Sequence, residues 1–526
     1  MMSEKLYLMG VDVGSTVCKV TIYDIAGHVF SIASKEYQGL LVSPRKNWYE
    51  FDPEVLWRTV ADCIRKSIAA RKLDPKDIIA LSVSVSGESV IPMGKNGKAV
   101  YNGIYWTDKR GRSYMSEREI LNKKIGSLKI YQITGYPLNY IPSSVKILWL
   151  KGKMPEVYNK VWKFMLWEDF INWKLTGEDF ISYSTASSSQ LFDIKAKKWS
   201  SEILEALDID ADILPECLPS GKIIGEVCPE ASRITRLSRK TVVVTGGWDQ
   251  ACCALGAGVV KEGDACDVAG TVECITPAVK KPLLNERALS IGLYCSTHVI
   301  ENLYLYFAFF PTSGAVLKWF KDTLAEKEVE VANKLGRDVY EILVERAAKA
   351  ELGASGLFVL PFFGGSGTGQ RPAFNPNARG AFIGFTLSHR KNDIVRAILE
   401  GIAFQTRLII EEIENLGVNI RELRAVGGGA KSRFWMQIKA DVTRKKIVLP
   451  DVTEAGTLGA AILAGVGSQV YSNLKKAVGN MCKVKDILHP RNNIATIYNR
   501  YYEIYKELYP SLMPIFNKMA EKLTSQ

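Results

Sequence analysis

The sequence predicts an α/β protein with two related domains. Its 526 residues exceed what one hydrophobic core usually supports. Short β-branched strands run repeatedly into Gly-rich turns and then into helices, a pattern typical of open α/β sheets. Residues 267–271 (DVAGT) also repeat the pattern of residues 12–16 (DVGST), an apolar strand that enters a turn of small residues. The repeat suggests two halves that face one cleft.

Composition argues against several classes of protein. The net charge of +12 comes from scattered lysines, without the basic and aromatic module of a nucleic-acid-binding protein. No apolar run reaches membrane-spanning length, and residues 1–10 (MMSEKLYLMG) lack the pattern of an export signal. The ten cysteines form no CxxC pair, which argues against a zinc site or a disulfide scaffold. We expect a cytoplasmic protein with no nucleic acid or membrane partner.

Three strands are expected at the start of the chain, over residues 6–12, 18–23 and 29–35. The turn between the first two contains Gly14, Ser15 and Thr16, whose N–H groups and hydroxyls suit phosphate oxygens. Asp12, at the strand end, could hold a magnesium ion through water. The alternative is an ordinary hairpin with a satisfied Asp12, and the motif by itself does not exclude it.

A further strand over residues 78–85 ends near Glu88, a second acidic residue at a strand tip. A hairpin turn at residues 96–97 follows and leads to Trp106 and Asp108. An aromatic ring beside Asp and Arg suits a polyhydroxylated ligand. The alternative is a core Trp106 with a surface ion pair between Asp108 and Arg110, and the local pattern alone favours it.

Helices are expected over residues 53–68, 142–151 and 164–175. Residues 181–190 are rich in Ser and Thr. Their hydroxyls either meet a ligand or fill a loop, and the sequence leaves both alternatives open.

Residues 241–258 (TVVVTGGWDQACCALGAG) are the stretch on which the functional hypothesis depends. A strand over residues 241–245 is expected to end in a turn at Gly246 and Gly247, with Asp249 as the N-cap of a small-residue helix. A carboxylate there faces the cleft of an open α/β sheet and can take a proton from a substrate hydroxyl. The alternative is that Asp249 only caps its helix.

The second half continues the alternation of strands, turns and helices. A helix over residues 311–324, a Gly-rich loop over 364–376 and a long helix over 392–416 are expected. Residues 427–429 form a triple-Gly turn between strand and helix, which lets the backbone approach a nucleotide closely. A small-residue helix follows within residues 451–465, and terminal helices end the chain.

Taken together, these motifs resemble the FGGY carbohydrate kinases, within the actin/hexokinase/Hsp70 ATPase superfamily. The resemblance rests on residues 146–150 (KILWL), 380–400 (GAFIGFTLSHRKNDIVRAILE) and 427–437, and it extends from about residue 7 to 465. It implies two ribonuclease-H-like α/β domains around a central cleft. Residues 1–245 would bind sugar and phosphate, residues 246–490 would bind the nucleotide, and residues 491–526 would form terminal helices.

The resemblance also implies roles for individual residues. Asp249 matches the catalytic base, and Asp12 matches the carboxylate linked to magnesium. The positions implied for ATP are Gly14, Ser15, Thr16, Gly270, Thr271, Gly314, Lys318, Gly428, Gly429 and Arg433. The positions implied for the sugar or polyol are Glu88, Trp106, Asp108, Asp249 and Gln250. Gly87 and residues 364–374 depart from the family pattern, which puts the identity of the substrate in doubt.

The expected reaction is MgATP-dependent phosphorylation of a terminal hydroxyl of a small sugar. A ketopentose such as xylulose comes first because the C-terminal half is most similar to xylulokinases. Within the family, a polyol or an aldonate is the alternative. Outside it, the alternatives are an ATPase that drives partner exchange and a basic scaffold for nucleic acid. The sequence leaves the oligomeric state open, a homodimer included.

Overall fold

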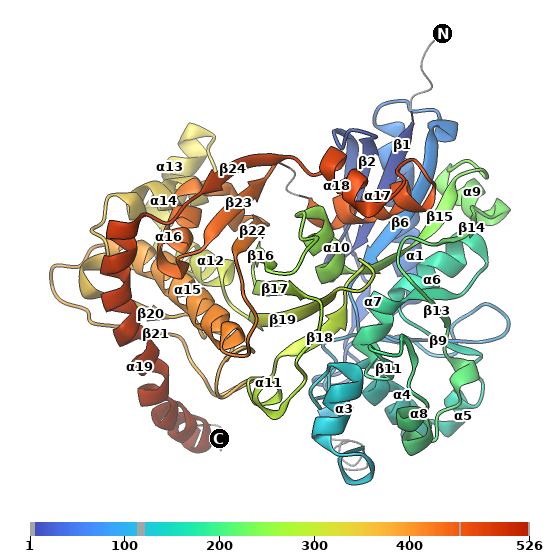
Figure 1. The fold of residues 1–526 in the computed structure, drawn as a ribbon, viewed down its shortest axis with the longest axis horizontal. Helices are drawn as coiled ribbons and strands as arrows, with labels where there is room; N and C mark the ends of the chain where they lie inside the picture. Colours follow the sequence, from blue (N-terminus) through green and yellow to red (C-terminus); the bar gives the residue numbers. More distant parts are fainter. Residues whose placement is uncertain (1–5, 113–120, 452–453, 524–526) are drawn as a thin grey trace.

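Two twisted sheets organise the chain in the computed structural model, which describes residues 6–112, 121–451 and 454–523. The first sheet has the order β14-β15-β6-β1-β2-β3 and the second β18-β19-β17-β16-β22-β23-β24. The strands of the first sheet are β1 (Tyr7–Val13), β2 (Val17–Asp24), β3 (Val29–Glu36), β6 (Ile78–Val85), β14 (Ile223–Glu226) and β15 (Val242–Trp248). Those of the second are β16 (Asp264–Ala269), β17 (Glu273–Val279), β18 (Tyr294–Thr297), β19 (Tyr304–Phe310), β22 (Glu422–Val426), β23 (Lys446–Pro450) and β24 (Val484–Leu488). Figure 1 shows the sheets in separate lobes, called here the first and the second lobe.

The predicted repeat of two halves is confirmed by the topology. In the first sheet β1 pairs antiparallel with β2 and parallel with β6, and β6 pairs parallel with β15. In the second sheet β16 pairs antiparallel with β17 and parallel with β22, and β22 pairs parallel with β23. An antiparallel strand, β14 or β24, closes the same side of each sheet. Each lobe therefore offers one hairpin turn and two strand ends at one edge.

Helices cover both sheets, and short strands lie in the insertions. The helices are α1 (Pro53–Ala69), α3 (Ser127–Thr134), α4 (Ser143–Lys153), α5 (Pro155–Tyr158), α6 (Trp167–Thr176), α7 (Tyr183–Ala186), α8 (Ser201–Leu207), α9 (Pro229–Thr235), α10 (Asp249–Gly256), α11 (Glu286–Ser290), α12 (Gly314–Leu324), α13 (Glu326–Leu335), α14 (Val339–Ala348), α15 (Lys391–Glu414), α16 (Arg433–Thr443), α17 (Ala455–Gly467), α18 (Leu474–Met481) and α19 (Asn492–Leu523). The minor strands are β4 (Leu41–Val42), β5 (Glu50–Phe51), β7 (Ile91–Met93), β8 (Gly103–Ile104), β9 (Lys163–Met165), β10 (Phe180–Ser182), β11 (Phe192–Asp193), β12 (Lys198–Trp199), β13 (Glu216–Leu218), β20 (Phe358–Leu360) and β21 (Ala381–Ile383). Over the described ranges, no helix is both long and apolar enough to cross a lipid bilayer.

The predicted turn at Gly246 and Gly247 is wrong, because β15 continues through both glycines to Trp248. Their small size serves close packing: a Cβ on Gly246 would lie 1.6 Å from the Val83 carbonyl oxygen. A Cβ on Gly247 would lie 2.4 Å from the Val299 side chain. The expected division between residues 245 and 246 therefore falls inside a strand that belongs to the first sheet throughout.

Helix α17 returns from the second half of the chain to the first lobe, where Figure 1 shows it beside β6 and β15. Glycines permit its contacts with its neighbours. A Cβ on Gly10 of β1 would lie 1.8 Å from the Thr457 carbonyl oxygen, and one on Gly459 would lie 2.0 Å from that of Cys252 in α10. Because α10 and α17 pack this closely, the second half of the chain contributes directly to the first lobe.

The expected terminal helices after residue 490 form a single long helix in the structure, α19. One of its faces carries Tyr498, Tyr502 and Tyr505, each 1% exposed. This face belongs to the same hydrophobic cluster as residues of α15 and α16, so the end of the chain completes the second lobe.

Candidate active site

Three acidic side chains come together where the parallel strands of the first sheet end. Asp12 is on β1, Glu88 follows β6, and Asp249 follows β15 directly. Strand register pairs Asp12 with Ser84, and Trp248 with Val85, so the strand ends are level. Burial and the negative charges of Asp12 and Glu88 raise the pKa of Asp249 to about 8. The structure thus brings together three of the predicted site residues from distant parts of the chain.

Asp249 is the first residue of α10, and Trp248 occupies the N-cap position without a side-chain capping bond. The prediction that Asp249 is the N-cap of its helix is therefore wrong by one residue, because Trp248 takes that position. The alternative in which Asp249 serves only as a cap assumed the same position. The carboxylate lies at a helix N-terminus, where the helix dipole favours negative charge. Burial outweighs that effect, and the raised pKa fits a group that takes up a proton during a reaction.

Asp12 accepts a hydrogen bond from the Ser84 hydroxyl at 2.7 Å. Burial raises the pKa of Asp12, while the Ser84 hydrogen bond and the charge of Lys19 oppose that rise. Lys19 faces Asp12 across the β1–β2 hairpin and forms a 2.7 Å ion pair with Glu454 at the start of α17. Lys19 is not among the predicted site residues, although its place opposite Asp12 in the predicted hairpin could have indicated it.

Glu88 has a left-handed backbone, with φ 63°, which is uncommon for a residue other than Gly. Burial raises the pKa of Glu88 to about 7, and the charge of Lys146 and a hydrogen bond from Tyr136 oppose that rise. The Tyr136 hydroxyl donates to Glu88 Oε1 at 3.4 Å. Burial also lowers the pKa of Lys146 to about 8, and its ammonium group donates to the Ile141 and Pro142 carbonyls. Sequence analysis did not assign Tyr136 or Lys146 to the site.

Two buried side-chain atoms of the predicted sugar-binding residues have no partner that meets hydrogen-bond geometry among the described residues. They are Trp106 Nε1, which can only donate, and Gln250 Oε1, which can only accept. Buried polar groups are normally paired, so an unpaired donor on Trp106 and an unpaired acceptor on Gln250, the residue after Asp249, suit a ligand that carries hydroxyl groups. The predicted roles of Trp106 and Gln250 are compatible with this geometry.

Asp108 does not have the environment predicted for a sugar-binding carboxylate. Arg110 Nε donates to Asp108 Oδ1 at 2.9 Å, and the Tyr49 amide donates to Asp108 Oδ2 at 2.6 Å. The ion pair favoured by the local sequence is therefore present, but it is buried and not at the surface. Arg110 also contacts Glu50 at 2.9 Å. Desolvation of Asp108 and Arg110 requires such pairing, so both carboxylate oxygens bind protein groups.

The predicted phosphate turn of the second lobe is fixed by neighbouring loops. The Gly314 amide donates to the Gly270 carbonyl at 3.0 Å, and the Ser313 amide donates to Thr271 at 2.9 Å. Gly427, with φ 91°, lies so close to Ala269 that its Cβ would be 2.8 Å from the Ala269 carbonyl. The β16–β17 turn, the start of α12 and the triple-Gly loop therefore meet at the carboxyl edge of β16 and β22.

A buried charge cluster lies beneath that turn. Lys439 of α16 contacts Asp267 at 2.8 Å and also Glu273, and all three side chains are fully buried. The Ser313 hydroxyl donates to Glu273 at 2.7 Å. The cluster thus joins both strands of the second hairpin to α12 and α16. Sequence analysis did not identify it, because its members are up to 172 residues apart.

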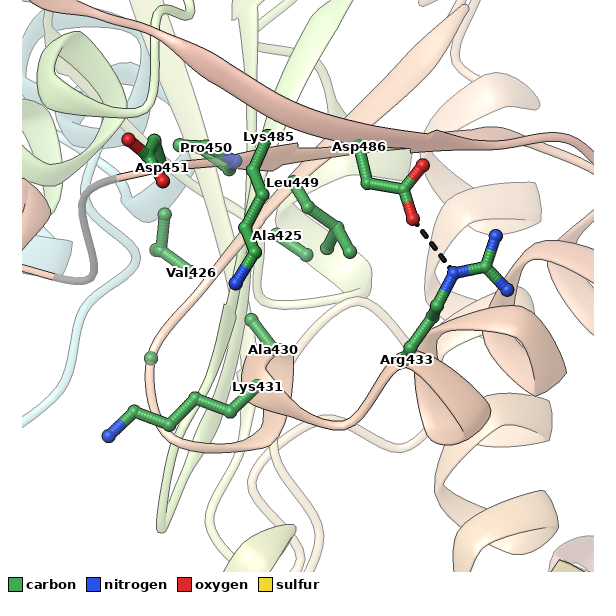
Figure 2. Close-up of a pocket in the computed structure, with 11 residues that line it drawn as sticks. Ala425, Val426, Ala430, Lys431, Arg433, Leu449, Pro450, Asp451, Lys485 and Asp486 are labelled. Atoms are coloured by element: carbon green, nitrogen blue, oxygen red, sulfur yellow. Dashed lines mark hydrogen bonds and ion pairs between the residues drawn. The ribbon is translucent and has the colours of Figure 1, made fainter.

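A cavity of about 490 Å³ opens beside the triple-Gly loop (Figure 2). Its lining comprises Ala425, Val426, Gly427, Ala430, Lys431, Arg433, Leu449, Pro450, Asp451, Lys485 and Asp486. The lining combines apolar residues such as Val426 and Leu449 with charged ones such as Lys485, which suits a nucleoside and its phosphates. Arg433, predicted at the nucleotide, lines the cavity and pairs with Asp486 at 2.8 Å. Lys318, predicted there too, is absent from the lining and pairs with Asp322 on its own helix at 2.5 Å.

Comparisons with known proteins cover nearly the whole chain. The model for the N-terminal domain of the FGGY family of carbohydrate kinases matches residues 7–256, and the model for its C-terminal domain matches residues 267–468. A xylulose kinase of Staphylococcus epidermidis is 28% identical over 510 residues, which are 96% of this chain and 97% of that protein. A gluconokinase of Bacillus licheniformis is 28% identical over 521 residues, which are 99% of this chain and 96% of that protein.

Solved structures give the same result. A ligand-bound xylulose kinase from Lactobacillus acidophilus superposes with a TM-score of 0.85 at 26% identity, over 97% of this chain and 99% of that one. A gluconate kinase from the same species superposes with a TM-score of 0.86 at 26% identity, over 98% and 99%. The predicted two-lobed fold is confirmed, and neither substrate is favoured by similarity alone.

Proposed function

Because this chain belongs to the FGGY family of carbohydrate kinases, we propose that it transfers the γ-phosphoryl group of MgATP to a terminal hydroxyl of a small uncharged sugar. A ketopentose such as xylulose is the first candidate, and a polyol such as glycerol or erythritol is the second. The observation that carries the proposal is the convergence of Asp249, Asp12 and Glu88 at one edge of the first sheet. The second phosphate turn and the 490 Å³ cavity supply the nucleotide side.

Asp249 is the general base of the proposed reaction. Its carboxylate orients the acceptor hydroxyl and takes the proton as the hydroxyl oxygen bonds to the γ-phosphorus and the bond to the β–γ bridging oxygen breaks. ADP leaves with that bridging oxygen. Since the transition state is loose, proton removal comes late, and a carboxylate is a sufficient base. In the two turns, the amides of Gly14 and Gly270 bond to the carbonyls of Val17 and Val272, so the backbone N–H groups that would reach the phosphoryl oxygens are those of residues 15–16 and 271.

The residues around Asp12 fit a magnesium ion. Ser84 occupies one carboxylate oxygen at 2.7 Å, and the other has no hydrogen bond among the described residues. Mg²⁺ typically takes one or two protein carboxylates and completes its shell with water and substrate phosphates. The ion would neutralise negative charge on the phosphates. Lys19, opposite Asp12, would place a second positive charge beside the first phosphate turn.

The charge of the site supports an uncharged acceptor over an aldonate. Burial raises the pKa of Asp249 to about 8, and the negative charges of Asp12 and Glu88 contribute to the rise. A gluconate carboxylate in the same site would add a further negative charge. The neighbouring cation, Lys146, already donates hydrogen bonds to two backbone carbonyls and interacts with the charge of Glu88. Hydroxyl groups, in contrast, can use the unpaired Trp106 and Gln250 atoms.

ADP formation over a panel of xylulose, ribulose, glycerol, erythritol and gluconate tests the proposal, with ATP turnover without acceptor as the baseline. We expect the highest kcat/KM for an uncharged acceptor and the lowest for gluconate. Asp249→Asn is expected to lower kcat by about 10²- to 10⁴-fold, the range for loss of a general base, while ATP binding persists. Near-wild-type turnover in Asp249→Asn, or gluconate as the best acceptor, would contradict the proposal.

A further inference from the structure

Residues 182–189, rich in serine, form a buried segment between two strand ends of the first lobe. The segment comprises α7 and the short 3-10 turn Ser187–Ser189. Ser184, Ser187 and Ser188 are each 0% exposed. These hydroxyls therefore bind protein groups, and of the two alternatives left open by the sequence, exposure to a ligand does not apply to them.

Ser188 binds the backbone of Glu88. The Glu88 amide donates to Ser188 Oγ at 3.2 Å, and the same hydroxyl donates to the Thr185 carbonyl at 2.8 Å. This donation directs a lone pair of Ser188 toward Glu88. The contact is close, because a Cβ on Gly87 would lie only 2.9 Å from Ser188 Oγ. Since Glu88 has φ 63°, its conformation needs support from its surroundings.

Ser184, one helical turn earlier, holds the strand end that carries Asp249. The Trp248 amide, directly before Asp249, donates to Ser184 Oγ at 3.3 Å. Glu168 of α6 reinforces the same strand: its Oε1 accepts from the Gly246 amide at 3.0 Å, and its Oε2 accepts from the Ser182 hydroxyl at 2.6 Å. One buried segment is therefore bonded to both carboxylate-bearing strand ends.

We infer that Ser184 and Ser188 are positioning residues that set the placement of Asp249 relative to Glu88. The two hydroxyls are four residues apart on one segment, so the distance between their partners is fixed by helical geometry. A displacement of about 1 Å in a reacting group costs on the order of 10²-fold in rate, so this spacing matters for chemistry. The hydrogen bonds of Ser184 and Ser188 hold the two strand ends whatever the reaction is, and the effect on catalysis rests on the proposed function.

Hydrogen–deuterium exchange of Ser184→Ala, Ser188→Ala and Ser189→Ala tests the positioning role without any substrate. Ser189 is the matched control, because it is 1% exposed and, among the described residues, its hydroxyl bonds to Ala186 and to Leu191, just after the segment, and to neither strand end. We expect Ser188→Ala to speed exchange in a peptide spanning residues 86–90, Ser184→Ala to speed it in one spanning 246–250, and Ser189→Ala to change neither. Exchange at both strand ends identical to that of Ser189→Ala would overturn the inference. Should Ser188→Ala not fold, Ser188→Cys keeps a weak acceptor in similar volume and is expected to show the same change at smaller amplitude.

Kinetics then separate the positioning role from the proposed function. With the best acceptor, Ser188→Ala is expected to raise the KM for sugar about tenfold, the effect of one lost buried hydrogen bond, and to leave the KM for MgATP unchanged. Ser184→Ala is expected to lower kcat about tenfold, because it acts through Asp249. In a Glu88→Ala background Ser188→Ala should have no further effect on sugar KM. Equal sugar KM and kcat in all three serine variants would overturn the catalytic consequence. A wild-type protein without sugar-dependent turnover, together with the expected exchange pattern, would contradict the proposed function and leave the structural inference standing.

Discussion

Lys19 and Glu454 are 435 residues apart in the chain and form a 2.7 Å ion pair beside Asp12. The pair joins β2, the second strand of the first hairpin, to the start of α17. Gly456, two residues further on, lies so close to Asp12 that a Cβ there would be 3.0 Å from the Asp12 carboxyl carbon. The first hairpin and the segment returning from the second lobe are thus held together beside Asp12.

Lys19→Met is expected to lower kcat by about 10²-fold, because it removes a preorganised positive charge beside the first phosphate turn. Glu454→Gln is the matched variant, since it breaks the same ion pair but keeps the lysine. We expect this variant to retain at least a third of the wild-type kcat in the ADP-formation assay. Equal losses in the two variants would mean that Lys19 acts only as a tether.

Glu88→Gln is expected to shift the acid limb of the kcat profile to lower pH. The negative charge of Glu88 helps to raise the pKa of Asp249, and the base works only when deprotonated. Without that charge Asp249 loses its proton at lower pH, so activity persists further into acid. The profile is measured from pH 5.5 to 9 at saturating MgATP and sugar. Glu400→Gln, which alters a buried carboxylate in the second lobe, should leave the limb unmoved, and an unmoved limb in Glu88→Gln would contradict the prediction.

Lys485→Ala and Lys431→Ala are each expected to raise the KM for MgATP roughly fivefold, as for about 1 kcal/mol of lost interaction, without changing the KM for sugar. Figure 2 shows the Lys485 side chain directed into the cavity, between Val426 and Ala430. Lys483→Ala is the control, because Lys483 is an exposed lysine on the same segment that does not line the cavity. The KM for MgATP is measured for all three variants. If Lys483→Ala raises this KM as much as Lys485→Ala does, the cavity is not the nucleotide-binding site.

Gly246→Ala is expected to lower the free energy of unfolding by roughly 3 kcal/mol or more, because its Cβ would lie 1.6 Å from the Val83 carbonyl oxygen. Gly428→Ala tests the opposite case. No atom lies within 4 Å of its would-be Cβ, and its φ of −62° is open to any residue. Urea denaturation should show Gly428→Ala within about 0.5 kcal/mol of wild type. Similar stability of the two variants would show that β15 does not pack as described.

His298 is expected to make the protein sensitive to acid. Burial lowers the pKa of His298 from 6.5 to about 4, because a buried ring is harder to charge than one in water. Stability from the neutral ring is present above pH 6.5 and is lost as the pH falls toward 4, by up to roughly 3 kcal/mol. His298→Gln should flatten this part of the curve of unfolding free energy against pH. His28→Gln, at an exposed histidine, should leave it unchanged, and identical curves for wild type and His298→Gln would contradict the prediction.

Local patterns predicted the elements on which the candidate site is built. The strand ends at Asp12, Glu88 and Asp249, the small-residue turns at residues 14–16 and 270–271, and the triple-Gly loop each need only a few neighbouring residues to be recognised. Strand periodicity and turn chemistry act over that range. The repeated order of strands in the two sheets follows from the same repeated patterns, and the structure confirms it.

Other features depended on contacts between distant segments and could not be read locally. Gly246 looked like a turn residue because the Val83 carbonyl, which leaves no room for a Cβ at this position, is in another strand. The local pattern favoured the ion pair of Asp108 with Arg110 but placed it at the surface, because the Tyr49 amide that also binds Asp108 comes from a separate segment. The serine-rich segment had no decidable role until its hydroxyls were found on the amides of Glu88 and Trp248.

By itself, the sequence determined the fold class, the two-fold repeat and the identity of the acidic residues at the strand ends, because hydrophobic periodicity and turn-forming residues act locally. Only the tertiary structure decided which polar groups are already paired and which stay available to a ligand. That distinction depends on burial, since a polar group removed from water must bind another group, and its partner can come from anywhere in the chain.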